Sequence, residues 1–84
     1  MTNRVALERM AAGLTQEQLA ESVAVSRQTI VAIEGGDYSP STVLALRLSV
    51  VLEVPFDQLF ALSNGAYSEL ARRRQRIVPA RGGR

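Results

Sequence analysis

The sequence contains no cysteine and no histidine. The lack of cysteine excludes disulfides, thiolate nucleophiles and cysteine-based zinc sites, and the lack of histidine removes the commonest metal ligand and general base. The apolar runs fall short of the roughly 18 residues that a membrane span needs, and the first residues do not form an apolar signal region. We expect a cytoplasmic binding module without metal, cofactor or membrane. An enzyme is the weakest hypothesis, because the scattered Ser, Asp and Glu residues form no recognisable nucleophile–base arrangement.

Lysine is also absent, so arginine supplies all ten basic residues of the 84-residue chain. The net charge of +2 does not by itself indicate a nucleic-acid partner, but its distribution is uneven. Residues 1–63 hold four Arg and seven acidic residues, whereas residues 64–84 hold six Arg and one acidic residue. An apolar content of 46% is enough for one modest core. We therefore predict a mildly acidic domain over 1–63 and an Arg-rich extension over 64–84.

Capping signals divide the domain into five short helices, and the predicted fold is all-α. The helices are expected from Asn3 to Ala12, from Thr15 to the break at Ala24-Val25, from Ser26 to Glu34, from Val43 to Leu52, and at Pro55, which fits the first turn of the fifth. Ser26 is the expected cap of the third helix and Ser41 that of the fourth. Thr15 and Gln18 form a capping-box pattern, and Gly13 suits a left-handed helix end. The near-continuous apolar character of the fourth helix predicts burial on most of its sides. The frequent caps and the lack of hairpin turn pairs argue against strands.

Two regions keep an alternative open. The apolar residues near the end of the domain are expected in the core, unless an exposed member marks a dimer interface; they are Phe56, Leu59, Phe60 and Leu62. The Arg-rich run 72–76 is expected to be disordered, with Pro79 and Gly82-Gly83 favouring fraying. The alternative is an amphipathic helix, marked by Tyr67, Leu70 and Ile77, that docks on the domain or on a second subunit. In either case its charge adds salt-sensitive affinity for a polyanion.

The expected third helix carries two different faces. At 100° per residue, Ile30 and Ile33 share one face, which must be buried. The opposite face carries Arg27, Gln28, Val31 and Ala32. A rod about 14 Å long fits the ~12 Å major groove of B-form DNA. Arg and Gln can pair with base edges, and small apolar side chains can contact thymine methyl groups. The helix therefore predicts a DNA duplex as partner.

Residues 3–62 resemble the helix-turn-helix domain of the Cro and phage-repressor (XRE) type, found in many small bacterial regulators. The matching strings are Gly13-Leu14-Thr15-Gln16-Glu17-Gln18-Leu19-Ala20, Val25-Ser26-Arg27-Gln28-Thr29-Ile30, Ile33-Glu34, Tyr38-Ser39-Pro40-Ser41 and Val54-Pro55-Phe56. Their order and spacing are specific, and only the tail lies outside the resemblance. It implies a compact five-helix domain whose second and third helices form the motif, with Ala20 small enough for the two helices to approach closely.

The resemblance also assigns roles to single residues. The positions implied to face bases are Arg27, Gln28, Val31 and Ala32. The positions implied to contact phosphates are Thr15, Gln16, Ser26, Thr29, Gly36 and Ser39. Arg9 and Glu34 match a pair that in several relatives forms a largely buried salt bridge between the first helix and the recognition helix. No catalytic or metal-binding residue is implied.

Three positions depart from the family pattern. Ala24 stands at the turn where relatives usually have Gly, and a left-handed backbone there would cost about 1 kcal/mol. Gly35 replaces an Asn that is common before the second glycine, which removes a side-chain contact near the DNA backbone. Glu8 occupies a position that is often apolar, so the first helix is the element least well defined by the pattern.

The resemblance implies a sequence-specific transcriptional regulator, a repressor in preference to an activator. It would bind double-stranded DNA as a homodimer on an inverted repeat, with half-sites about 34 Å apart, and so localise to the nucleoid. One alternative is an antitoxin or restriction-modification controller, which uses the same DNA face; a toxin or polymerase is then a candidate protein partner. Another is a protein-interaction module that does not bind DNA, since the domain is acidic and Val31 and Ala32 are apolar.

Overall fold

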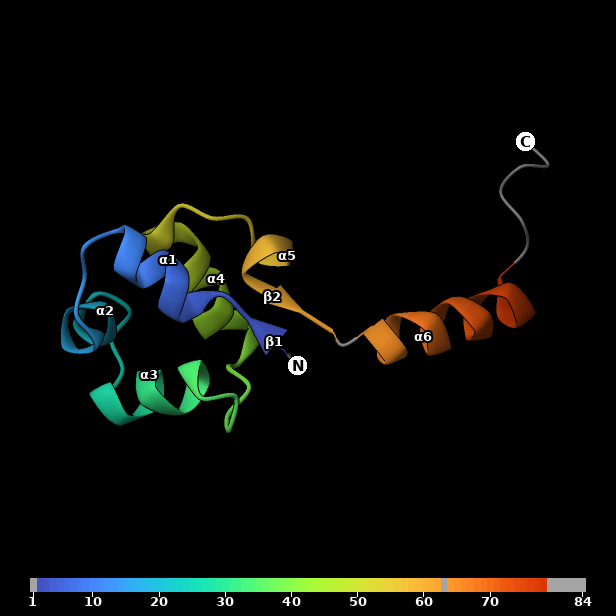
Figure 1. Ribbon diagram of the computed structural model, residues 1–84, viewed down its shortest axis with the longest axis horizontal. Helices are drawn as coiled ribbons and strands as arrows, with labels where there is room; N and C mark the ends of the chain where they lie inside the picture. Colours follow the sequence, from blue (N-terminus) through green and yellow to red (C-terminus); the bar gives the residue numbers. More distant parts are fainter. Residues whose placement is uncertain (1, 63, 79–84) are drawn as a thin grey trace.

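The computed structural model describes residues 2–62 and 64–78, in which six helices and two short strands are present (Figure 1). The helices are α1 (Val5–Ala11), α2 (Gln16–Ser22), α3 (Arg27–Glu34), α4 (Thr42–Leu52), α5 (Phe56–Leu59) and α6 (Asn64–Ile77), and the strands are β1 (Thr2–Asn3) and β2 (Phe60–Ala61). The all-α class is confirmed, and α1–α5 are the five predicted helices. The predicted fraying signals at Pro79 and Gly82-Gly83 lie outside the described residues. No helix within the described ranges has the length and apolar character to cross a membrane.

Side-chain caps set the starts of the three central helices. At α2, the Gln18 N–H donates to Thr15 Oγ1 at 3.0 Å and the Thr15 N–H donates to Gln18 Oε1 at 2.9 Å, which confirms the predicted capping box. The Ser26 hydroxyl caps α3 and the Ser41 hydroxyl caps α4 by accepting backbone N–H groups three residues further on. Each cap satisfies an N–H group that has no partner inside the helix.

The core lies where α1 to α5 and β2 meet. It consists of Val5, Leu19, Ala20, Val23, Ile30, Ile33, Leu44, Ala45, Leu48, Leu52, Leu59 and Phe60. Ile30 and Ile33 are fully buried, which confirms the inward face predicted for α3. Ala20 is also buried, at the place where α2 passes α3. Burial of these side chains holds the domain together, because each contributes roughly 1.5–3 kcal/mol when it is an aliphatic residue removed from water.

The predicted burial of α4 on most sides is wrong. Val43, Leu46 and Val50 are exposed, Val50 by 76%, and they lie on one face at the spacing i, i+3, i+7. The opposite face meets the core, through Leu44 and Leu48 among others. The near-continuous apolar sequence of α4 does not show which of its faces the rest of the domain covers, because that depends on tertiary contacts. The same holds for Phe56 and Leu62, which are exposed although core positions were expected.

The two strands were not predicted. β1 pairs antiparallel with β2, with Thr2 opposite Ala61 and Asn3 opposite Phe60. The pairing joins residues 59 positions apart, so no local turn signal announces it. It also changes the start of α1, which begins at Val5 rather than after an Asn3 cap. Asn3 still accepts the Val5 N–H at 3.1 Å.

The Arg-rich extension is helical over 64–77 and not disordered as expected (Figure 1). α6 projects from the domain and accounts for a longest dimension of 49 Å against 25 and 21 Å. The Leu62 N–H donates to the Tyr67 hydroxyl at 3.4 Å, at the junction with the domain. The alternative prediction of an amphipathic helix therefore describes this segment better. It does not dock on its own domain, because its side chains from residue 67 onward are exposed.

Ala24, in the turn between α2 and α3, has a φ of 62°, so the left-handed conformation considered from the sequence is present. Ala24→Gly should raise the free energy of unfolding by about 0.5–1 kcal/mol, because glycine removes the Cβ strain. Urea denaturation measures the change. Ala12→Gly is the control: Ala12 ends α1 with a φ of −82°, so the same substitution relieves no strain and should not stabilise. A loss of stability in Ala24→Gly would contradict the prediction.

Candidate nucleic-acid interface

α3 presents the face that was predicted to meet DNA. The side chains of Arg27, Gln28 and Val31 are exposed, and Ala32 is half-buried. They lie opposite the two buried isoleucines, so the core fixes which face of α3 points outward. The face therefore offers two long hydrogen-bonding side chains in the first turn of α3 and two small apolar side chains in the next.

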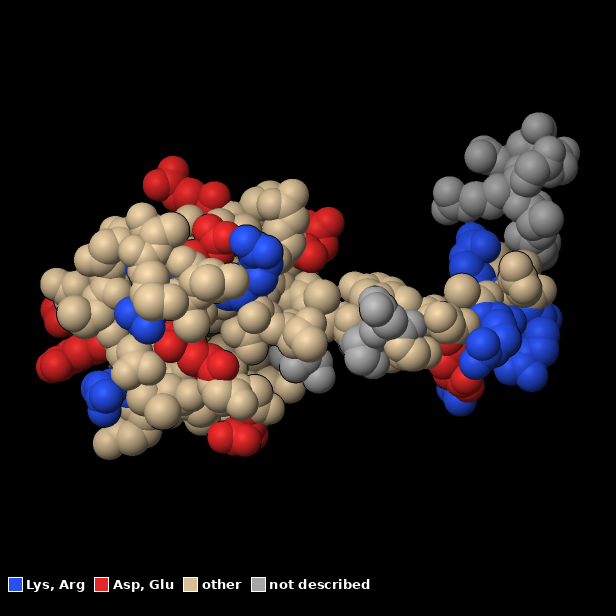
Figure 2. All heavy atoms as spheres, in the orientation of Figure 1, with Lys and Arg blue, Asp and Glu red and all other residues tan. Residues whose placement is uncertain are grey.

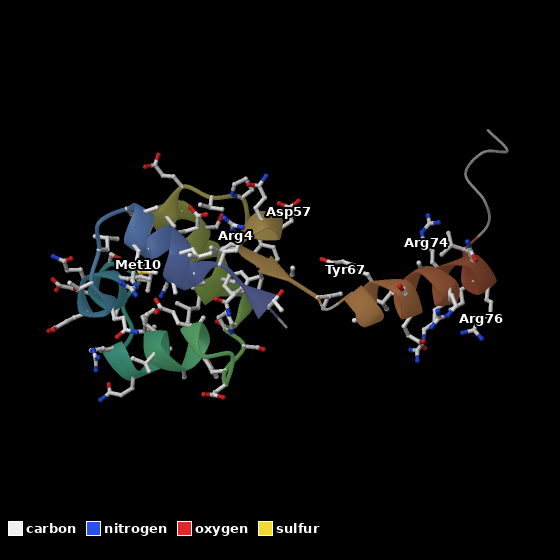
Figure 3. The ribbon with its side chains drawn as sticks, viewed as in Figure 1. Arg4, Met10, Asp57, Tyr67, Arg74 and Arg76 are labelled. Atoms are coloured by element: carbon white, nitrogen blue, oxygen red, sulfur yellow. The ribbon has the colours of Figure 1, made fainter. Side chains whose placement is uncertain are left out.

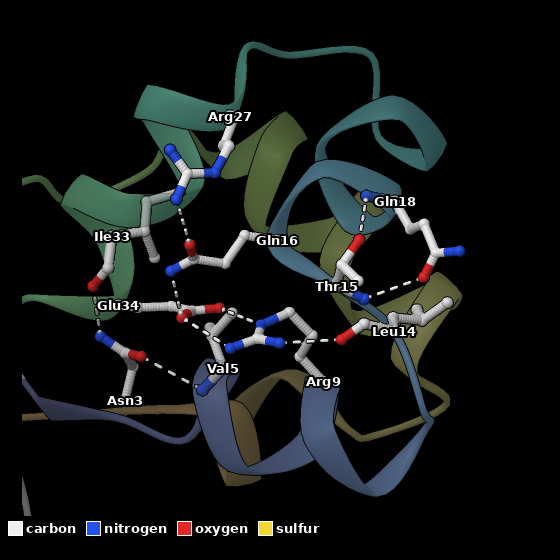
Figure 4. Close-up of polar contacts among 10 residues, drawn as sticks. All are labelled: Asn3, Val5, Arg9, Leu14, Thr15, Gln16, Gln18, Arg27, Ile33 and Glu34. Atoms are coloured by element: carbon white, nitrogen blue, oxygen red, sulfur yellow. Dashed lines mark hydrogen bonds and ion pairs between the residues drawn. The ribbon is translucent and has the colours of Figure 1, made fainter.

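Arg9 and Glu34 form an ion pair that joins α1 to the last turn of α3 (Figure 4). Arg9 Nε donates to Glu34 Oε2 at 2.7 Å and Arg9 NH2 donates to Glu34 Oε1 at 3.2 Å. The side chains are only 13% and 8% exposed. The side-chain hydrogen bond to Glu34 raises the pKa of Arg9 above its ordinary value, so the guanidinium stays protonated. A carboxylate at a helix C-terminus is unfavourable, and the bidentate arginine offsets that repulsion.

Arg9 also reaches the loop before α2, since its NH1 donates to the Leu14 carbonyl at 2.8 Å. One guanidinium therefore ties together α1, the 13–15 loop and α3. Five N–H donors in a fixed planar arrangement make this possible, and a lysine could not reproduce it. The ion pair thus sets the distance between the entry to α2 and the end of α3.

Gln16 extends this network to the exposed face of α3. Its Nε2 donates to Glu34 Oε1 at 3.1 Å, and its Oε1 accepts from Arg27 NH2 at 3.1 Å (Figure 4). The orientation of the amide is dictated by its neighbours, because arginine can only donate and an ionised carboxylate can only accept. A chain of polar contacts therefore runs from the largely buried Arg9 through Glu34 and Gln16 to Arg27. It restrains Arg27 before any ligand is bound and leaves the other guanidinium donors free.

No pattern in the sequence indicates that Asn3 helps to position α3. Asn3 Nδ2 donates to the Ile33 carbonyl at 2.9 Å, while its Oδ1 accepts the Val5 N–H. The Ile33 carbonyl, in the last turn of α3, also accepts the Gly36 N–H at 3.0 Å, so Asn3 adds a second hydrogen bond at this helix end. Both this contact and the bridging role of Gln16 join residues far apart in the chain, so no local pattern reveals them.

The structure brings some of the predicted phosphate-contacting residues together and leaves others apart. Gln16 meets Arg27, so the beginnings of α2 and α3 are adjacent. Thr15 and Ser26 use their hydroxyl oxygens as helix caps, and Ser26 Oγ also lies 3.0 Å from Thr29 Oγ1. Gly36 and Ser39 are exposed in the loop beyond the other end of α3. The predicted contacts therefore bracket α3 at its two ends.

Comparisons with known proteins agree with this arrangement. A helix-turn-helix family model (HTH_3) matches residues 5–59 and leaves α6 outside the match. The uncharacterized HTH-type transcriptional regulator YgzD of Bacillus subtilis is 44% identical over 62 residues, which cover 74% of this chain and 94% of that protein. An uncharacterized HTH-type transcriptional regulator of Methanocaldococcus jannaschii is 43% identical over 60 residues, covering 71% of this chain and 91% of that protein.

Among solved structures, the restriction-modification controller protein C.AhdI from Aeromonas hydrophila is similar, with a TM-score of 0.64 and 33% sequence identity. The similarity covers 68% of this chain and 86% of the controller protein. Family match, sequence relatives and fold thus agree with the resemblance seen in the sequence. The chain belongs to the Cro/C1-type (XRE) helix-turn-helix family of DNA-binding transcription regulators.

Proposed function

We propose that the protein is a sequence-specific repressor that binds an inverted-repeat operator as a homodimer. The observation that carries this proposal is the outer face of α3, where Arg27 and Gln28 are exposed while the isoleucines behind them are buried. A helix held this way can enter the major groove, where arginine recognises guanine and glutamine recognises adenine through paired hydrogen bonds. Occupancy of an operator would then exclude or contact polymerase, with no chemical step.

The residues around α3 suit a phosphate-contacting role in the proposed complex. Gln16 has one amide N–H beyond the one donated to Glu34, and Arg27 has donors beyond the one given to Gln16. The exposed Thr15 hydroxyl accepts a backbone N–H group, which leaves its hydrogen for a phosphate oxygen. Ser26 Oγ and Thr29 Oγ1 share a hydrogen bond, so one of their two hydroxyl hydrogens is left for a phosphate oxygen. Such contacts fix the register of a protein on the duplex and carry no sequence information. Gly36 and Ser39 would contact the backbone at the far end of α3.

A homodimer is favoured by apolar surface on the side of α5. Phe56 is 45% exposed and Leu62 is 41% exposed. Both belong to the apolar residues near the end of the domain, among which an exposed member was expected to mark a dimer interface. Two identical domains related by a two-fold axis would present two α3 helices to half-sites about one helical turn apart, roughly 34 Å. The proposed operator symmetry follows from this dimer symmetry.

Selection of binding sites from random DNA with the purified protein tests the proposal. We expect a motif made of two inverted half-sites. A single unrepeated half-site would contradict the dimer. No preference for any duplex at low ionic strength, where phosphate attraction is strongest, would contradict DNA binding itself.

Gln28→Ala should weaken binding to the selected operator by about 1–3 kcal/mol and relax the preference at one or two base pairs of each half-site. Its side chain lies on the outer face of α3, so the domain should remain as stable as before. Binding-site selection and fluorescence anisotropy measure the two effects. Gln58→Ala is the control, because Gln58 is an exposed glutamine of α5, away from α3 (Figure 1). An unchanged motif for Gln28→Ala would count against base recognition by this residue.

The similarity to a restriction-modification controller favours that role as a second candidate. A controller would use the same α3 face, so DNA binding alone does not separate the two. A neighbouring restriction or methyltransferase gene, with the selected operator in front of it, would support the controller. An operator in front of unrelated genes would support a general repressor.

A further inference from the structure

α6 lacks the packing that a helix of its length needs. It spans 14 residues, lies outside the matched family region, and is exposed from Tyr67 onward. Helices shorter than about 12–15 residues are marginal in water unless one face packs against other structure. The contacts of Glu69 with Arg72 at 2.9 Å and with Arg73 at 3.1 Å are exposed and support the helix only weakly. A partner is therefore required to stabilise α6.

The helix has an apolar face and a charged face. At 100° per residue, the apolar face consists of Ala66, Tyr67, Leu70, Ala71 and Ile77. Glu69, Arg72 and Arg76 lie on the opposite side. Arg74 is an exception to this division, because it is charged and falls within the apolar face. Figure 3 shows Arg74 on the same side of α6 as Tyr67, with Arg76 pointing the other way. A charged residue in an apolar face indicates a partner that carries an opposite charge at that point.

The apolar face of α6 continues onto the domain. Where α5 approaches the start of α6, the surface is hollowed, and this α5–α6 hollow is lined by Phe56, Asp57, Phe60, Ala61, Leu62 and Tyr67. The rings of Phe56 and Phe60 lie 5.6 Å apart. Asp57 is the acidic residue of the hollow, and no ion pair within the described ranges involves Asp57 or Arg74. An unpaired acid and an unpaired base thus belong to one apolar surface.

We infer that this surface is closed by a second copy of the chain, with the two α6 helices antiparallel and Arg74 paired with Asp57 of the partner subunit. The inference rests on the homodimer of the proposed function and specifies what holds it together. The distal half of each α6 covers the α5–α6 hollow of the other subunit. A two-fold interface of this kind contains every contact twice.

The positions along α6 fit a two-fold axis. The midpoint between Tyr67 and Arg74 falls between Leu70 and Ala71, in the centre of the apolar face. Antiparallel pairing about this point brings Arg74 of one helix beside Tyr67 of the other, and Tyr67 lines the hollow that contains Asp57. The separation of Tyr67 and Arg74 along the helix is about 10 Å. The hollow of each subunit therefore lies within reach of the other helix.

The charges of α6 favour the antiparallel arrangement. Its arginines all lie in the distal half, and Figure 2 shows them crowded at the end of α6 away from the domain. Parallel pairing would place arginine against arginine, whereas antiparallel pairing places each arginine-rich half against the other subunit's first half, which carries Glu69 and no arginine. A DNA duplex would engage the charged face through Arg72 and Arg76 and leave the apolar face uncovered. A second copy accounts for the apolar face and for Arg74.

Charge reversal in the full-length protein tests the inference. Arg74→Glu and Asp57→Arg should each raise the dimer dissociation constant about tenfold or more, because each places like charges together twice in the interface. Mixing the two variants should restore dimerisation as a heterodimer, because position 74 of each subunit then faces an opposite charge at position 57 of the other. Sedimentation equilibrium measures the constants, and native mass spectrometry identifies the heterodimer. Circular dichroism checks that each variant is folded.

Arg76→Glu is the matched control, because it makes the same charge change on the opposite face of α6. It should leave the dimer dissociation constant unchanged. Equal effects of Arg74→Glu and Arg76→Glu, or the absence of a heterodimer on mixing, would overturn the inference. If both variants stay dimeric and only Arg74→Glu binds the operator less well, α6 serves DNA instead, and this inference is overturned while the proposed repressor dimer stands. A wild-type protein that is monomeric on its operator would overturn the dimer of the proposed function as well.

Discussion

Glu34→Ala should lower the free energy of unfolding by about 3–5 kcal/mol, which is the usual effect of removing one partner of a buried ion pair. The substitution leaves the Arg9 guanidinium, 13% exposed, without its carboxylate, and it removes the acceptor of Gln16. Since small domains are stable by only about 5–15 kcal/mol, the loss is large. Urea denaturation followed by circular dichroism measures it.

Glu8→Ala is the control for the Glu34 variant. Glu8 also pairs with an arginine, but its contact with Arg4 is 3.5 Å long and the Arg4 side chain is 59% exposed. A surface pair of this kind contributes about 0–1 kcal/mol. A comparable loss in both variants would mean that burial of the Arg9–Glu34 pair is not what makes it important.

Ile30→Ala should lower the free energy of unfolding by about 2–5 kcal/mol, because it removes fully buried methyl groups and leaves a cavity behind α3. Val31→Ala is the control on the same helix: Val31 is 41% exposed, and its truncation should change stability by no more than about 0.5 kcal/mol. In operator recognition we expect the opposite order, with the larger effect from Val31→Ala. Val31→Ala, which alters the proposed base-facing surface, should change the selected motif, whereas the folded fraction of Ile30→Ala should retain it. The same loss of stability in both variants would refute the assignment of faces on α3.

Much of the candidate site is predictable from local sequence. The Thr15, Ser26 and Ser41 caps locate three helix starts, and the spacing of Ile30 and Ile33 determines the outward face of α3. The Arg9–Glu34 pair followed from the resemblance to a family, and the structure contains it. The bridge through Gln16 was not predictable, since it depends on where three separate segments meet.

The order of caps, breaks and apolar spacings in the sequence determined the five helices, their class and the exposed side chains of α3, because helix formation and amphipathicity are local properties. Tertiary structure decided which of these elements and side chains contact one another. The pairing of β1 with β2, the uncovered face of α4 and the projection of α6 depend on contacts between distant residues or on the absence of such contacts among those described. A periodic pattern indicates that one face of a helix is apolar. Only the tertiary structure shows whether other residues of the same chain cover that face or leave it exposed for a partner.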